Sequence, residues 1–381
     1  MADTSLFWNR SGEAHELPTF PSSLEDWNVG QPLDDHRQMI LARVEAALSL
    51  RIKRMWLRSQ NNSLILEIEY ENNERDIVRT PNPEVVDDKD EAALTVPREA
   101  KLLRWLKSRD AALPVPSVRA IIEPDDAFAY SIVVMEKMPG TMVVDAVGNA
   151  SDEAKAQLMR SYAEFEVQLF RIEVPQRIGE ARCEDLTISV DCTEGSPSSL
   201  EEHFNAILEL KERSLEDIEE APVRESGTRI LARLKSQLPD LYARLASPSR
   251  RRCVLKHDDL SPQNILMNSE GKITGVIDWD MQVVLPAALA VSYPSFIRYD
   301  GKYHPEYARE PYPGVEIWWF VSPGDSLRLR ELYTQIAREL DEEYYDALVN
   351  GEVLRQVADW LGGSPDYVLM ERWMETAFPS A

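Results

Sequence analysis

Residues 251–280, RRCVLKHDDLSPQNILMNSEGKITGVIDWD, contain the pattern that decides the fold. The apolar run Cys253–Leu255 is typical of a short strand, and it leads into the polar loop His257–Gln263. Two more apolar runs follow, separated by a polar turn that contains Gly271. This order predicts a strand, a loop and then a hairpin that closes around the glycine.

Closing the hairpin around Gly271 brings a carboxamide and a carboxylate together. Asn264 and Asp278 fall almost opposite each other, and Asp259 lies in the loop that leads in. Mg²⁺ takes oxygen ligands, commonly one or two protein groups together with phosphate oxygens and water. A nearby carboxylate such as that of Asp259 can accept the proton of an incoming hydroxyl. The arrangement predicts phosphoryl transfer from ATP, with His257 supporting the loop by hydrogen bonds.

The segments HDDLSPQNIL and GVIDWD resemble the catalytic loop and the metal-binding segment of the aminoglycoside phosphotransferase family. That family is similar to choline kinases and, more distantly, to protein kinases. The resemblance spans about residues 55–300 and implies ATP and Mg²⁺ as cofactors. It implies Asp259 as the catalytic base, His257 as the loop histidine, and Asn264 and Asp278 as the metal ligands.

The resemblance also implies the fold class, which is α+β. We expect a bilobal protein-kinase-like fold with a small β-rich N-terminal lobe and a larger, mainly helical C-terminal lobe. Residues 1–34 have no sustained period and are interpreted as an irregular extension. Residues 35–137 would form the nucleotide-binding lobe, with a helix from about Pro97 to Ser108, and residues 138–381 the catalytic and substrate lobe.

Weaker motifs in the first lobe support the same resemblance. IVRTP is similar to the strand whose basic residue contacts nucleotide phosphates, here Arg79, and VPREAKLLRWL to the helix whose glutamate pairs with it, here Glu99. The alternative for both is an ordinary exposed ion pair. VVMEKMPG resembles the hinge, where backbone groups from Glu136 to Met138 would bind adenine. Its alternative is an edge strand that runs into a Pro-Gly turn.

The turn that should cover the phosphates reads RSQNNSLI and lacks glycine, which leaves Asn62 and Ser63 as the candidate contacts. This departure favours an alternative function, a catalytically inactive pseudokinase that binds a nucleotide or a metabolite. The complete set of catalytic and metal residues favours an enzyme instead. No DFG tripeptide or APE-type segment follows Asp278, which argues against a protein kinase.

Composition limits the partners. The formal net charge is −24 over 381 residues, so a nucleic-acid partner is not expected. The acidity either favours a small, cationic, hydroxylated acceptor or only provides solubility. No apolar run is long enough to span a membrane, and three cysteines indicate a reducing compartment, so we expect a cytoplasmic protein. The oligomeric state is left open by the sequence.

Overall fold

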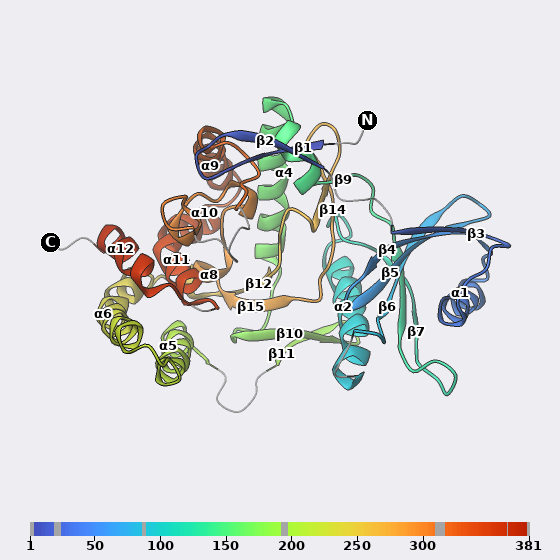
Figure 1. The fold of residues 1–381 in the computed structure, drawn as a ribbon, viewed down its shortest axis with the longest axis horizontal. Coiled ribbons are helices and arrows are strands. Elements are labelled where there is room, and N and C mark those ends of the chain that lie inside the picture. The colour runs from blue at the N-terminus through green and yellow to red at the C-terminus, as the bar shows by residue number, and fades with distance from the viewer. Residues whose placement is uncertain are drawn as a thin grey trace.

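The structure is a computed structural model, and it describes residues 4–18, 24–85, 89–191, 197–308, 317–363 and 365–378. It has two lobes, with the β-rich lobe at the right of Figure 1 and the mainly helical lobe at the left. The α+β bilobal architecture is therefore confirmed. No helix in the described ranges is both long enough and apolar enough to cross a bilayer.

The smaller lobe is built on one antiparallel sheet in the order β3-β4-β5-β6-β8-β7. Its strands are β3 (Glu25–Asn28), β4 (Ile52–Gln60), β5 (Ser63–Tyr70), β6 (Arg75–Pro81), β7 (Val118–Ile122) and β8 (Ile132–Glu136). Two helices accompany it, α1 (Asp35–Leu48) and α2 (Lys89–Arg109). Ile40 and Val44 of α1 share one apolar cluster with the sheet, whereas Leu103 of α2 belongs to a second cluster. That second cluster continues into the other lobe, which ties the two lobes together.

The larger lobe combines helices with two small sheets, in the orders β14-β13-β9 and β11-β10-β15-β12. Its strands are β9 (Thr141–Met142), β10 (Gly179–Glu184), β11 (Thr187–Asp191), β12 (Cys253–His257), β13 (Ile265–Met267), β14 (Ile273–Val276) and β15 (Gln282–Pro286). Its longer helices are α4 (Asp152–Arg171), α5 (Leu200–Glu216), α6 (Ala221–Arg244), α9 (Pro323–Leu340), α10 (Glu342–Asn350), α11 (Glu352–Leu361) and α12 (Tyr367–Ala377). Single turns of helix are α3 (Val143–Ala146), α7 (Pro248–Arg251) and α8 (Ala287–Ala290), with 3₁₀ turns at Val147–Asn149, Ser295–Ile297 and Gly301–Tyr303.

Residues 1–34 differ from the irregular extension that we expected. β1 (Thr4–Trp8) and β2 (Ala14–Pro18) form a hairpin that lies on the larger lobe, at the top of Figure 1. Trp8 and Trp319 exchange two backbone hydrogen bonds, at 2.9 and 2.8 Å. β3 pairs with β4, so the smaller lobe begins before residue 35. Such short strands are stable only through their partners, and their own sequence carries a weak signal.

The helix expected from Pro97 begins earlier, at Lys89. Proline favours the first turn of a helix, which is why the sequence suggested a start there. Val96 is buried in the same cluster as Ala100 and Leu103, and this packing holds the preceding turn helical despite the proline. Of the three cysteines, Cys183 and Cys253 are buried free thiols, and Cys192 lies outside the described residues.

The β13–β14 hairpin closes around Gly271 as predicted. Gly271 has a φ of +87°, and a Cβ atom there would lie 1.9 Å from the carbonyl oxygen of Ala154 in α4. The hairpin tip thus presses on the first turn of α4, which Ser151 caps by accepting a bond from the amide of Ala154. This contact fixes the hairpin that carries the site residues.

We expect Gly271→Ala to destabilise the protein by about 3 kcal/mol or more, because strain and a backbone clash add together. Gly30→Ala is the matched control, since Gly30 has a φ of +90° with nothing within 4 Å of the added Cβ. It should cost only about 1–2 kcal/mol, the strain alone. Urea unfolding of both variants checks this, and equal losses would contradict it.

Candidate active site

A buried guanidinium stands at the centre of the site between the lobes. Arg79 extends from β6 and is 7% exposed. Its Nη1 lies 2.6 Å from Oε2 of Glu99 in α2 and 2.8 Å from Oδ1 of Asp278, and its Nη2 lies 2.7 Å from Oδ2 of Asp280. Burial opposes the charge, but the three carboxylates raise the pKa of Arg79 above its usual range. The cation therefore bridges β6 and α2 to the segment that follows β14.

Glu99 is the buried partner in this cluster, with 2% exposure, and burial raises its pKa. Its second oxygen accepts the backbone N–H of Trp279 at 2.9 Å. The exposed ion pair, which was the alternative for Arg79 and Glu99, is excluded by this burial.

A buried tryptophan separates the two aspartates that contact Arg79. Trp279 is fully buried, and its indole N–H donates to the carbonyl of Val276 at 3.0 Å. Asp278 has a φ of 66°, in the left-handed region that costs a non-glycine residue on the order of 1 kcal/mol or more. The cluster of Arg79 and Glu99 holds this strained turn in place.

The loop after β12 brings the other predicted residues to the same place. Asn264 Nδ2 donates to the backbone oxygen of Asp259 at 2.8 Å and to its Oδ2 at 3.2 Å. The amide of Ile277 donates to the carbonyl of Asn264 at 2.9 Å, so Asn264 and Asp278 lie beside each other as the hairpin predicted. Asp259, Asn264 and Asp278 thus form one constellation.

His257 anchors the start of this loop to the segment that follows β14. It is 2% exposed, its Nε2 lies 3.0 Å from the carbonyl of Ile277, and its ring lies 4.7 Å from that of Trp279. Burial lowers the pKa of His257, so the ring is neutral and Nε2 carries the proton that the carbonyl accepts. We place His257 among the positioning residues.

The glycine-free turn between β4 and β5 is braced by a residue that the sequence analysis missed. Asn82 is buried; its Nδ2 donates to the carbonyls of Gln60 and Asn61 at 3.1 and 2.9 Å, and its N–H to that of Asn62 at 2.9 Å. Ser63 Oγ accepts a bond from Arg79 Nε at 3.2 Å. The turn is therefore tied directly to the charged centre.

The segment Glu136–Met138 connects the lobes beside the β13–β14 hairpin. The amide of Glu136 donates to the carbonyl of Ser117 at 2.9 Å, which anchors the end of β8. Met138 packs on Gly275 of β14, where a Cβ atom would lie 2.7 Å from Cβ of Met138. The connecting segment and the β13–β14 hairpin are thus in direct contact.

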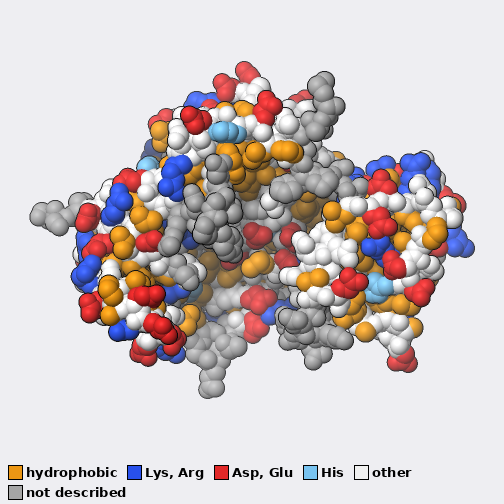
Figure 2. All heavy atoms as spheres, in the orientation of Figure 1, with side chains coloured by type: hydrophobic (Ala, Val, Ile, Leu, Met, Phe, Trp, Pro, Cys, Tyr) orange, Lys and Arg blue, Asp and Glu red, His pale blue; other side chains and the backbone are white. Residues whose placement is uncertain are grey.

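The donor set of the site suits a hard cation that is only partly held by protein. In the described part of the chain, no three His, Cys, Asp or Glu residues converge as a complete metal cage. The carboxamide of Asn264 and the carboxylate of Asp278 offer oxygen ligands, which Mg²⁺ supplements with phosphate oxygens and water. Figure 2 shows acidic side chains in the hollow between the two lobes.

Residues 53–289 match the model of the phosphotransferase enzyme family, APH. The chain belongs to this family. A family relative from Ampulloclitocybe clavipes, named clavilactone A biosynthesis cluster protein Y, is 31% identical over 387 residues, which cover 96% of this chain and 94% of the relative. The family assignment confirms the resemblance seen in the catalytic loop and makes the chain a kinase-type phosphotransferase.

Solved structures with the same fold are aminoglycoside phosphotransferases. ADP-bound APH(2'')-Ib aligns with a TM-score of 0.50 at 16% identity, and the alignment covers 91% of this chain and 97% of the APH(2'')-Ib chain. The gentamicin complex of APH(2'')-IIa aligns with a TM-score of 0.50 at 15% identity and covers 92% and 98%. At these identities the likeness establishes the protein-kinase-like fold alone.

Sequence reasoning left Asp280 without a settled place and missed Glu67. Asp280 forms an ion pair with Arg79. The order Asp-Trp-Asp could have predicted this contact, because burying the tryptophan turns both aspartates toward the same side of the chain. Glu67 is buried in β5 and accepts a bond from Lys137 Nζ of the hinge at 2.7 Å. An acidic residue within an apolar strand gave no hint of that distant partner.

We expect Arg79→Ala to lower the free energy of unfolding by about 3–5 kcal/mol, because it leaves Glu99 buried without its cation. Asp278→Asn should change it by less than about 1 kcal/mol, since Arg79 keeps two carboxylates and asparagine accepts the left-handed turn. Denaturant unfolding measures both. Arg213→Ala, which breaks an exposed ion pair with Glu209, is the control. An Arg79→Ala protein as stable as this control would contradict the argument.

Proposed function

We propose that this protein is an ATP- and Mg²⁺-dependent phosphotransferase that acts on a hydroxyl group of a small molecule. The observation that carries the proposal is the convergence of Asp259, Asn264 and Asp278 with the buried Arg79–Glu99 pair. Each group alone has ordinary structural uses, but together they supply a metal site, a phosphate contact and a proton acceptor. The aminoglycoside phosphotransferases that share this fold are enzymes of this kind, which supports the proposal by analogy.

Residues from five parts of the chain would bind the nucleotide. The carbonyl of Glu136 and the backbone of Met138 would bind adenine, and Asn62 and Ser63 would cover the phosphates. Arg79 would contact the phosphates while Glu99 holds it in place. Asn264 and Asp278 would bind Mg²⁺, which when present neutralises charge on the transferred phosphoryl group.

We assign Asp259 as the general base that accepts the proton of the acceptor hydroxyl. Its carboxylate is exposed, while the bond from Asn264 Nδ2 fixes its direction. The hydroxyl oxygen forms the new bond to phosphorus as the bond to the leaving phosphate oxygen breaks, and its proton passes to Asp259. Positioning and electrostatics supply most of the rate in such transfers.

Arg79 would exchange partners when the nucleotide binds. In the structure its guanidinium is bonded to Asp278 and Asp280. Phosphate oxygens can replace these carboxylates, because guanidinium binds phosphate equally well, and Asp278 is then released to the metal.

The pseudokinase is a second candidate, favoured by the glycine-free turn at residues 61–62. It predicts Mg-nucleotide binding without turnover on any acceptor. The bracing of that turn by Asn82 is compatible with both candidates, because both bind a nucleotide. The presence of Asp259 beside Asn264 favours the enzyme, because a protein that only binds needs no proton acceptor.

We expect Mg-ATP to raise the melting temperature of the wild type by several degrees, since a ligand at a hundred times its Kd adds about 2.7 kcal/mol. Asp259→Asn should keep this shift and lose turnover by a factor of about 10²–10⁴, the usual contribution of a general base. Asp278→Ala should lose the shift itself. Thermal melts with Mg-ATP, Mg-GTP and Mg²⁺ alone, combined with ADP release, measure both effects. Wild-type turnover in Asp259→Asn would rule out the assigned mechanism.

A further inference from the structure

A cavity of about 710 Å³ opens beside the catalytic loop. One side of it is formed by Asp259 and by Ser261, Pro262 and Gln263 of the same loop. Its volume lies in the range that holds a drug-sized ligand. A molecule in this cavity can place a hydroxyl at the carboxylate of Asp259, so the cavity is the natural place for the acceptor.

The opposite wall of the cavity is aromatic. Its rings come from three separate segments of the chain: Tyr303, Tyr307, Trp318, Trp319, Phe320 and Trp360. Aromatic side chains offer large, rigid surfaces that stack on flat apolar ligands, and such pairs contribute about 0.5–1.5 kcal/mol each beyond their buried area. The lining therefore favours an acceptor with an aromatic or similarly flat apolar body.

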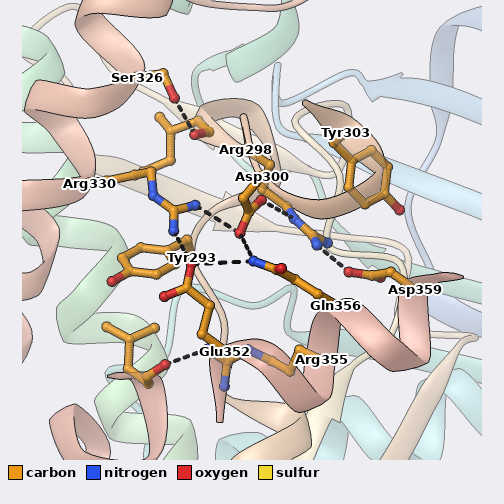
Figure 3. Close-up of polar contacts among 12 residues, drawn as sticks. Tyr293, Arg298, Asp300, Tyr303, Ser326, Arg330, Glu352, Arg355, Gln356 and Asp359 are labelled. Atoms are coloured by element: carbon orange, nitrogen blue, oxygen red, sulfur yellow. Dashed lines mark hydrogen bonds and ion pairs between the residues drawn. The ribbon is translucent and has the colours of Figure 1, made fainter. Parts of the chain in front are cut away.

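The charged groups of the lining are already paired within the protein. Arg298 bonds to Asp359 and lies 4.2 Å from the ring centre of Tyr303, and Figure 3 shows these three side chains together. Lys302 Nζ donates to the carbonyl of Asp359 at 2.5 Å. These cations are therefore compensated within the protein and have no need of an anionic ligand.

Two acidic residues line the cavity among the residues that the structure describes. They are Asp259 and Asp366, and the carboxylate of Asp366 caps α12 by accepting the amide of Leu369 at 3.1 Å. An acceptor with several ammonium groups would need several carboxylates to replace its hydration. The described lining therefore offers a polycation one carboxylate besides that of Asp259, although the net charge of the chain is −24.

A charge network behind the cavity keeps this wall in place. Asp300 lies between Arg298 and Arg330, with Arg330 Nη1 at 3.2 Å from its Oδ2, and Arg330 Nη2 reaches Glu352 in α11 at 2.6 Å. Gln356 of α11 also donates to Asp300, at 3.3 Å. A smaller cavity of about 280 Å³ lies among these groups, and Arg298, Asp300 and Asp359 of the network belong to its lining.

The N-terminal hairpin holds the aromatic wall from outside. The rings of Phe7 and Phe320 lie 5.8 Å apart, and those of His15 and Trp318 lie 5.0 Å apart. Together with the backbone pairing of Trp8 and Trp319, these contacts set residues 318–320 before any ligand binds. A wall ordered in advance lowers the entropic cost of binding.

We infer that the acceptor of this phosphotransferase is a neutral hydroxylated molecule with a flat, aromatic or apolar body, and not an aminoglycoside-like polycation. The inference rests on the proposed function, because it assigns the cavity at Asp259 to the acceptor. The body of the molecule stacks on the aromatic wall while its hydroxyl reaches Asp259. Transfer then follows the reaction described above and requires no further reactant.

The test uses the full chain and naphthalene-2-methanol as a neutral aromatic probe, with gentamicin and choline as cationic comparators. Calorimetric titration gives the three dissociation constants for the wild type, and ADP release with Mg-ATP gives turnover. We expect the naphthalene probe to bind at least tenfold more tightly than either cation. Tighter binding of gentamicin or choline would overturn the inference, since it would mean that cation recognition dominates the cavity.

Variants locate the binding. Trp318→Ala and Tyr307→Ala should each weaken the naphthalene probe about tenfold, which corresponds to about 1.4 kcal/mol. Tyr307→Phe, which keeps the ring, should restore wild-type affinity. Trp56→Ala is the matched control, because Trp56 is equally half-buried but lies against Arg75 in the other lobe, and it should change nothing. Unchanged affinity in both alanine variants of the cavity would place the probe elsewhere and refute the inference.

The two proposals fail in different ways. If the protein responds to Mg-ATP in thermal melts but none of the naphthalene probe binds, the acceptor class is wrong and the proposed function stands. If the probe binds with the expected variant pattern but Mg-ATP has no effect, the proposed function is wrong. The cavity would then still be a site for a neutral aromatic ligand.

Discussion

The buried guanidinium of Arg79 is the interaction on which the remaining structure depends. It faces the buried Glu99 and the more exposed Asp278 and Asp280, so one cation neutralises part of three negative charges. A buried ion pair of this kind contributes little net stability compared with apolar packing, but losing one partner is costly. It therefore works mainly as a specificity device, because β6, α2 and the turn after β14 meet in only one arrangement that satisfies all four groups.

Packing makes this arrangement rigid on both sides. The apolar cluster of α2 continues through α4 into the larger lobe, and Met138, between the lobes, packs on Gly275 of the β13–β14 hairpin. Gly271 presses the far end of that hairpin on α4. The charged centre is thus supported by contacts that tolerate no added side chain, which explains how a strained turn at Asp278 persists.

The acceptor side is built differently. Its wall comes from segments around residues 303, 318 and 360, and the N-terminal hairpin completes it from the opposite end of the chain. Phosphoryl transfer requires the same charged centre whatever the acceptor, whereas the acceptor is selected by the shape and polarity of this wall. The family therefore indicates the class of reaction, and under the proposed function this wall would select the acceptor.

The sequence alone determined which residues gather in the candidate active site from its catalytic loop and hairpin. Asp259, Asn264 and Asp278 are spaced within one loop and one hairpin, and local spacing is enough to bring such groups together. Arg79 and Glu99 could be named only through the resemblance, because their partners lie far away in the chain. The tertiary structure alone decided that Asp280 binds Arg79, that Asn82 braces the phosphate turn and that the N-terminal residues form a hairpin on the aromatic wall. The physical reason is that short strands, buried charges and a cavity built from distant segments exist only through contacts that no local pattern records.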